Sequence, residues 1–214
     1  RDWSKKMNVY EAIGARRSIR QYARRPLSEE QILKLLHAAS QAPSAKNRQP
    51  WFFYVINDPD IKQKFVDALS SNIDHLYQRY RQKNIQRPDI LSAKNSLRAM
   101  EQAAVLILVK LTSSYGTYHD DGVDWPLHAL DIEVTDLLSV GAAIQNILLA
   151  AEEMGLGALW VCDIFYAYPA LTRFLQEDAP IVSAICLGYP GEVPDPRPRH
   201  PINEIFTVLR KKEE

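Results

Sequence analysis

The chain has 214 residues, of which 46% are hydrophobic and 24% charged, and its 26 Lys and Arg residues balance 26 Asp and Glu residues. This composition is typical of a soluble globular protein and excludes a largely disordered chain. Both cysteines, Cys162 and Cys186, lie in apolar runs. We therefore expect packed thiols and neither a disulfide framework nor a zinc cluster.

The positive charge is concentrated near the N-terminus. Residues 1–25 contain eight Lys and Arg residues against two acidic residues, a local charge of +6. Such an excess attracts an anion, either a polyanion or one well-placed phosphate. A nucleic-acid-binding protein is one interpretation, but only Trp3, Tyr10 and Tyr22 could interleave with the basic residues, and the whole chain is neutral.

Two strands and several helices are predicted in the first half of the chain. Ser28 is a good N-cap with Gln31 as capping-box partner, which predicts a helix that ends near Gln41, before Pro43. The aromatic and β-branched run 51–56 and the apolar run 103–111 predict buried strands. Residues 60–100 are predicted to form helices with polar faces, interrupted around Arg87 and Pro88.

The second half begins with a polar, aromatic loop at 115–126, which we assign to the substrate side. Residues 131–154 are predicted as the longest helix, apolar on all faces, so a subunit interface is the natural cover for it. Its apolar run, 137–151, is too short to span a bilayer. Strands at 158–162 and 181–187 flank a short helix at 169–176. No signal-peptide pattern opens the sequence, so we expect a soluble, cytoplasmic protein.

Known catalytic and metal motifs are absent from the sequence: there is no GxGxxG, Walker loop, HExxH or GxSxG. The segment His119-Asp120-Asp121 is better interpreted as a solvated turn than as a metal site. Two arginine clusters, ARRSIR at 15–20 and Arg197 with Arg199, could close on one phosphate, because guanidinium groups match phosphate oxygens bidentately. The alternative is that these arginines form ordinary surface ion pairs.

Four segments together resemble the FMN-dependent nitroreductases: RRSIR, residues 38–56, residues 141–160 and residues 187–201. Residues 60–130 match poorly, in a part of the family that varies with substrate. The resemblance implies an α+β fold, a three-layer sandwich with a central, mostly antiparallel sheet between helices, in an intertwined homodimer. It also implies a single domain over 1–214, with a C-terminal arm from about 190 reaching the partner subunit and adding a strand there at about 203–209.

The resemblance also implies the cofactor site. Arg16, Arg17 and Ser18 would meet the FMN phosphate and ribityl chain, with Arg197 and Arg199 closing from the other end. Arg20 would lie nearer the isoalloxazine and would be the catalytic residue. The partner subunit would supply Pro43, Ser44, Ala45 and Asn47. Further cofactor contacts are expected from Gln145 and from Val161, Cys162 and Asp163, where the family more often has Gly or Glu.

The function implied is an NAD(P)H oxidoreductase that reduces nitroaromatics, quinones or free flavin by a ping-pong cycle through FMN. Some relatives use the same cleft for reductive dehalogenation, flavin fragmentation or azoline oxidation, and these remain alternatives. A flavin carrier or sensor without turnover is another. No metal, membrane or nucleic-acid partner is expected.

Overall fold

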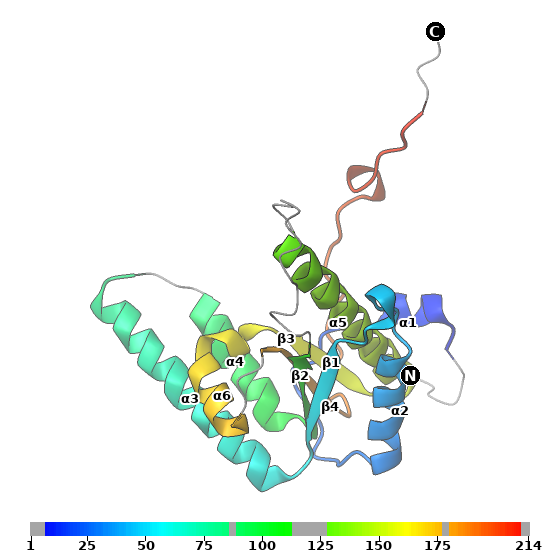
Figure 1. The fold of residues 1–214 in the computed structure, drawn as a ribbon. Helices are drawn as coiled ribbons and strands as arrows, with labels where there is room; N and C mark the ends of the chain where they lie inside the picture. The colour runs from blue at the N-terminus through cyan, green and yellow to red at the C-terminus, as the bar shows by residue number, and fades with distance from the viewer. Residues whose placement is uncertain (1–6, 86–88, 113–127, 177–179, 211–214) are drawn as a thin grey trace.

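The computed structural model describes residues 7–85, 89–112, 128–176 and 180–210. Four antiparallel strands form one sheet in the order β1-β2-β4-β3 (Figure 1). The strands are β1 (Trp51–Ile56), β2 (Val105–Leu111), β3 (Gly157–Val161) and β4 (Ile181–Gly188). The two central strands, β2 and β4, are the most apolar runs because both of their faces are covered.

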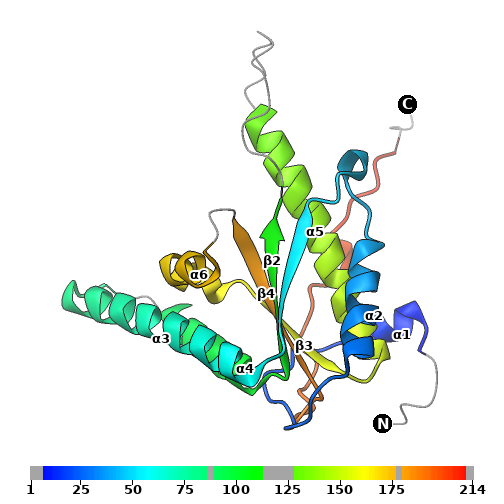
Figure 2. The same cartoon turned by 60° about the horizontal axis from the view of Figure 1, so that its bottom comes forward.

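Helices cover both faces of this sheet (Figures 1 and 2). One layer contains α1 (Val9–Ala15), α2 (Glu29–Ser40) and α5 (His128–Glu153), and the other contains α3 (Pro59–Gln82), α4 (Asp89–Gln102) and α6 (Tyr168–Leu175). Alternate residues of β2 enter the two cores: Leu106 and Leu108 pack toward α3 and α4, whereas Ile107 packs toward α2 and α5. The predicted three-layer α+β sandwich is confirmed.

The helix boundaries follow local signals. At the start of α2, Gln31 N donates to Ser28 Oγ at 3.2 Å and Ser28 N donates to Gln31 Oε1 at 2.9 Å, which is the predicted capping box. A second capping box, between Asn8 and Glu11, begins α1, which we did not predict. Helix α5 begins at His128, three residues earlier than expected. The predicted loop at 115–126, with His119 to Asp121, lies outside the described residues.

Helix α5 is the central helix of its layer. Residues Val134–Glu153 have a mean hydropathy of 1.5, so this segment is long and apolar enough to cross a membrane by composition alone. Its inner face, however, packs on the sheet through residues such as Ile144 and Ile147, which are fully buried. Its outer face leaves Leu138 69% exposed. This exposed apolar surface is what the predicted subunit interface would cover.

The C-terminal arm leaves the sandwich after β4. It contains one short 3-10 helix, η3 (Ile202–Glu204), and residues 197–210 are all exposed. Figure 1 shows the arm extending well away from the sheet. No described strand pairs with the outer edge of β1, so that edge is open to an added strand.

Candidate active site

The arginine-rich segment 16–25 is fastened to the end of the sheet by backbone hydrogen bonds. Ile19 N donates to Ala158 O at 3.0 Å beside a parallel bridge between Ser18 and Ala158, and Ala23 N donates to Tyr189 O at 2.9 Å. Between these ties, the buried Tyr22 hydroxyl donates to Ile19 O at 2.7 Å. The segment therefore has a fixed backbone although most of its side chains reach the surface.

A second set of contacts brings the C-terminal arm to the same place. Glu192 Oε1 accepts hydrogen bonds from Arg20 N at 2.6 Å and Gln21 N at 3.2 Å. Gly191 N donates to Gln21 O at 2.8 Å. Residues 194–199 consequently run beside ARRSIR, although more than 170 residues separate the two in the chain.

A basic hollow of about 380 Å³ lies between these two segments. It is lined by six of the predicted site residues, Arg16, Arg17, Ser18, Arg20, Arg197 and Arg199. Burial lowers the pKa of Arg16 from its usual value, and repulsion from Arg199 and Arg17 lowers it further, whereas Glu152 opposes that shift. Cations crowded in this way are stabilised by a bound anion, and arginine is well suited to phosphate oxygens.

A larger cleft of about 740 Å³ adjoins the basic hollow, because Arg20 and Arg197 line both. Val161, Cys162 and Asp163 lie in its wall, where β3 ends. The structure thus places the end-of-strand residues and the arginine cluster in two adjoining depressions that share Arg20 and Arg197 in their walls.

One side of this cleft is formed by helix α4. The carboxylate of Asp163 accepts hydrogen bonds from Ser96 Oγ at 2.6 Å and Ser92 Oγ at 3.3 Å. Asn95 and Arg98 of the same helix also line the cleft. The two serine bonds fix the helix against the turn that follows β3, so the cleft has a rigid polar wall.

The prediction that Cys162 is a packed thiol is wrong. Cys162 is exposed, because β3 ends at Val161 and the chain turns into the 3-10 helix η2 (Asp163–Ala167). Partial desolvation still raises the pKa of this thiol above its usual value. Cys186 is fully buried in β4, as expected, and burial raises its pKa to about 12.

The loop that carries Pro43, Ser44, Ala45 and Asn47 lies far from the arginine cluster in the fold. It contains η1 (Ala45–Asn47) and packs on the first half of α5, where Ala45 N donates to Ser139 Oγ at 3.4 Å. The arginine cluster faces Glu152, near the other end of α5. Sixteen residues of helix, roughly 24 Å, separate Asp136 beside the loop from Glu152. Gln145 is half-buried on α5 and lines neither the hollow nor the cleft.

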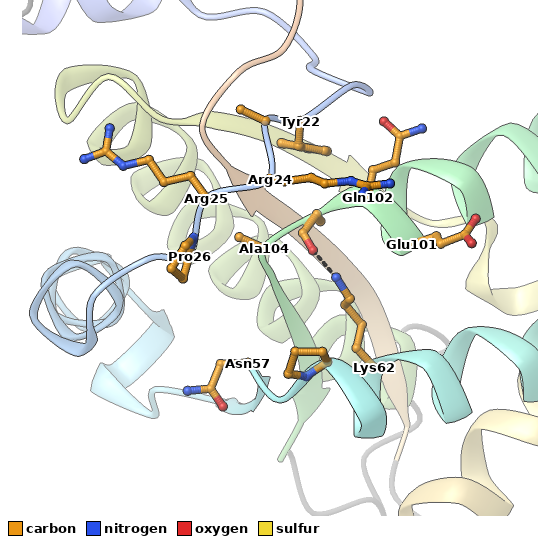
Figure 3. A pocket seen from close by; sticks show the side chains of 12 residues that line it. Tyr22, Arg24, Arg25, Pro26, Asn57, Lys62, Glu101, Gln102 and Ala104 are labelled. Atoms are coloured by element: carbon orange, nitrogen blue, oxygen red, sulfur yellow. Dashed lines mark hydrogen bonds between the residues drawn. The ribbon is translucent and has the colours of Figure 1, made fainter.

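A third depression, of about 730 Å³, is lined by Tyr22 and by both basic and acidic residues, among them Arg24, Lys62 and Glu101 (Figure 3). Lys62 donates to the carbonyl of Ala103, just after α4, and so caps that helix; burial lowers its pKa. Arg25 is placed 3.8 Å from the ring centroid of Tyr189. These contacts account for two of the basic groups of this depression.

The structure also shows site residues that the sequence analysis did not select. Glu192 orients the ARRSIR backbone, and Ser92, Ser96 and Arg98 contribute the α4 wall. The spacing of Ser92 and Ser96 by one helical turn was visible, but their common partner Asp163 lies 67 residues after Ser96. No local pattern indicates such a pairing.

The family model described as "Nitroreductase family" matches residues 13–189 of this chain. The chain belongs to the nitroreductase family. Among solved structures, a BluB-like flavoprotein from Clostridium difficile is 28% identical with a TM-score of 0.79, over 95% of this chain and 100% of the other. A candidate nitroreductase from Desulfovibrio desulfuricans, solved in complex with FMN, is 28% identical with a TM-score of 0.68, over 96% and 99% of the two chains.

Sequence relatives within the nitroreductase family have several activities in their names. A protein of Methanothermobacter thermautotrophicus, 32% identical over 90% of this chain and 82% of its own, is named as a candidate NADH dehydrogenase/NAD(P)H nitroreductase. An iodotyrosine deiodinase of Nematostella vectensis is 27% identical over 95% of this chain and 76% of its own length. The family assignment thus supports an oxidoreductase without selecting one acceptor.

Proposed function

We propose that this nitroreductase-family protein is a cytoplasmic, homodimeric, FMN-dependent NAD(P)H oxidoreductase that reduces small electrophilic acceptors such as nitroaromatics and quinones. The observation that carries the proposal is the basic hollow of Arg16, Arg17 and Arg199, which adjoins the cleft at the end of β3. The FMN complex of a structural relative supports the same cofactor.

The residues of the hollow fit a phosphate ester. Arg16 is crowded by two other guanidinium groups, and a dianionic phosphate would relieve that repulsion while accepting bidentate hydrogen bonds. The Ser18 hydroxyl lines the same hollow. Arg20 and Arg197 line both depressions, and of these two cations we assign Arg20 the role between phosphate and ring.

The chemistry required of the protein is modest. FMN, when bound, supplies hydride transfer between NAD(P)H and the acceptor. Arg20 would stabilise the negative charge that arrives with the hydride, since a nearby cation favours the charged form of its neighbour. Val161, Cys162 and Asp163 would bind through backbone groups at the end of β3.

The separation of the expected cofactor contacts within one chain supports the proposed homodimer. The loop at 43–47 lies roughly 24 Å along α5 from the arginine cluster, so it cannot reach the cluster of its own chain. A two-fold axis near α5 would bring this loop to the partner's cluster, and would cover exposed residues such as Leu138. The apolar arm residues Phe206 and Leu209, 56% and 93% exposed, would pack on the partner. Phe206→Asp together with Leu209→Asp should therefore shift the mass measured by sedimentation from dimer toward monomer.

Steady-state kinetics test the proposed activity. Anaerobic NADPH or NADH oxidation should depend on added menadione or a nitroaromatic, with parallel double-reciprocal plots that indicate a ping-pong cycle. Arg20→Ala should retain flavin yet show a slower reductive half-reaction in stopped-flow absorbance. Flavin binding with no acceptor-dependent NAD(P)H oxidation would favour a carrier or sensor instead.

A further inference from the structure

We propose that Arg98, with Asn95 one turn earlier on α4, binds an anionic group on the molecule that occupies the cleft opposite the flavin. The ligand would be a carboxylate or phosphate bearer: an acidic aromatic acceptor, or the 2′-phosphate of the nicotinamide donor. This inference rests on the proposed function and names the ligand class that the site selects.

The first support is the excess of positive charge in the cleft. Arg20, Arg98 and Arg197 all line it, and Asp163 is the single carboxylate among its described lining residues. Arg20 and Arg197 also line the basic hollow and are accounted for by FMN, whereas Arg98 lines only the cleft. One guanidinium is therefore left that FMN does not explain.

The second support is that the cleft's carboxylate is already engaged. Asp163 accepts hydrogen bonds from Ser96 at 2.6 Å and Ser92 at 3.3 Å, and it makes no ion pair with a described residue. Within the described part of the chain, Arg98 has neither an ion pair nor a side-chain hydrogen bond, although Glu101 follows three residues later on the same helix. Its donors remain available to a ligand.

The third support is the rigidity of the helix that carries Arg98. The serine bonds to Asp163 fix the middle of α4, and Ala99 and Met100, which follow Arg98 directly, are buried in the core. Asn95, which also lines the cleft, offers both amide donors and an acceptor. The helix thus holds the Cα positions of Arg98 and Asn95, and the planar guanidinium loses less side-chain entropy per hydrogen bond to an anion than a lysine would.

Paired ligands that differ by one charge test the proposal on the oxidised holoprotein, without turnover. Titrations with 4-nitrobenzoate and 4-nitrobenzamide, followed through flavin absorbance and by isothermal calorimetry, give the two dissociation constants. A second pair, NADP⁺ and NAD⁺, distinguishes the donor's phosphate from an acceptor's carboxylate. Wild-type protein should bind at least one anionic member more tightly than its neutral or less charged counterpart.

Arg98→Gln should raise the dissociation constant of that anionic ligand about tenfold, which corresponds to the loss of one charge-assisted hydrogen bond. The dissociation constant of its neutral or less charged counterpart should not change. The matched control is Arg79→Gln, the same change at an exposed arginine of α3, which should bind both pairs as wild type does. If Arg98→Gln loses affinity for 4-nitrobenzoate, the site binds the acceptor. If it loses affinity for NADP⁺, the site binds the donor.

Equal affinities within both pairs, or an Arg98→Gln protein indistinguishable from wild type, would overturn the proposal. Failure of the proposed function looks different, because wild-type protein would then retain no FMN after desalting or would not be reduced by NAD(P)H. A holoprotein that is reduced normally yet shows no preference for either anion contradicts this inference alone.

Discussion

The guanidinium of Arg48 donates two hydrogen bonds to a single oxygen of Asp136, from Nε at 2.9 Å and from Nη2 at 2.7 Å. Asp136 is fully buried near the start of α5, and its other carboxylate oxygen has no hydrogen-bond partner among the described residues. This pair holds the loop in which Lys46, Asn47 and Gln49 all have positive φ angles of 50–54°. Non-glycine residues seldom adopt that conformation, so the surrounding contacts must impose it.

Removal of Arg48 should therefore be costly. Arg48→Ala leaves a buried carboxylate without its cation, and we expect a loss of about 3 kcal/mol in the free energy of unfolding, measured by urea denaturation. The control is Lys34→Ala, which breaks the exposed ion pair between Lys34 and Glu30 on α2 and should leave the urea midpoint unchanged. Equal midpoints for both variants would show that the Arg48–Asp136 pair does not stabilise the fold.

Arg199 should recognise the phosphate of FMN and not its ring. Arg199→Gln removes one guanidinium from the basic hollow, so the dissociation constant of FMN should rise by about tenfold to a hundredfold. Riboflavin, which lacks the phosphate, should bind wild type and variant equally. Fluorescence titration with both ligands measures this difference, and a parallel loss for riboflavin would argue against a phosphate contact.

The close packing of segment 16–25 on β3 depends on a glycine. A Cβ at Gly157 would lie 2.8 Å from Ile19 Cγ2 and 2.9 Å from Ile19 Cβ, so the segment would have to move. Gly157→Ala should cost about 1–3 kcal/mol of stability and weaken FMN binding, because Ser18 and Arg20, which line the basic hollow, flank Ile19. Gly14→Ala is the control for stability, because a Cβ there meets no atom within 4 Å. This change in α1 should leave the stability of the protein unchanged or raise it slightly. Thermal unfolding of both variants and FMN titration of Gly157→Ala test this.

The two thiols should differ sharply in reactivity. In native protein one thiol per chain, Cys162, should react with Ellman's reagent, and two should react in urea. The raised pKa of Cys162 keeps the thiolate scarce at neutral pH, so the rate should climb steadily as the pH approaches and passes 9. Cys162→Ala should abolish the native reaction; a reaction that persists would place the reactive thiol at Cys186.

Cys186 adds a pH dependence of stability. Its folded pKa of about 12 exceeds the ordinary value of 9.0, so the native state favours the neutral thiol. This contribution is fully present below pH 9 and is lost as the pH rises from 9 toward 12, because the unfolded chain ionises first. The urea midpoint should fall over that range.

Elements marked by strong local signals were predictable from sequence. The capping box at Ser28 and Gln31 located α2, and the apolar runs located β1, β2 and β4. Burial was predicted correctly for β2 and β4, but it was wrong for β1, an edge strand in which Ile56 is buried and Phe52 is 50% exposed. The exposure of Cys162 was missed because its apolar neighbours, Val161 and Ile164, do not indicate where β3 ends. The meeting of the two arginine clusters was predicted, first as one interpretation of the arginine pattern and then from the family resemblance.

Long-range polar contacts were not predictable. Arg48 and Asp136 are separated by 88 residues, and Arg20 meets Glu192 across 172 residues. Each partner alone resembles an ordinary surface residue of its type, and only the folded backbone brings the two together. The same holds for the α4 wall, since Arg98 lines the cleft only because the fold places the end of β3 and Asp163 beside α4.

The most direct measurement is the visible absorption spectrum of protein that has been supplemented with FMN, desalted, and treated anaerobically with NADPH and then NADH. The protein should retain the yellow colour, which should bleach with at least one of the two donors. Protein that retains no flavin after desalting would show that Arg16, Arg17 and Arg199 hold something else, and retained colour that neither donor bleaches would contradict the proposed oxidoreductase.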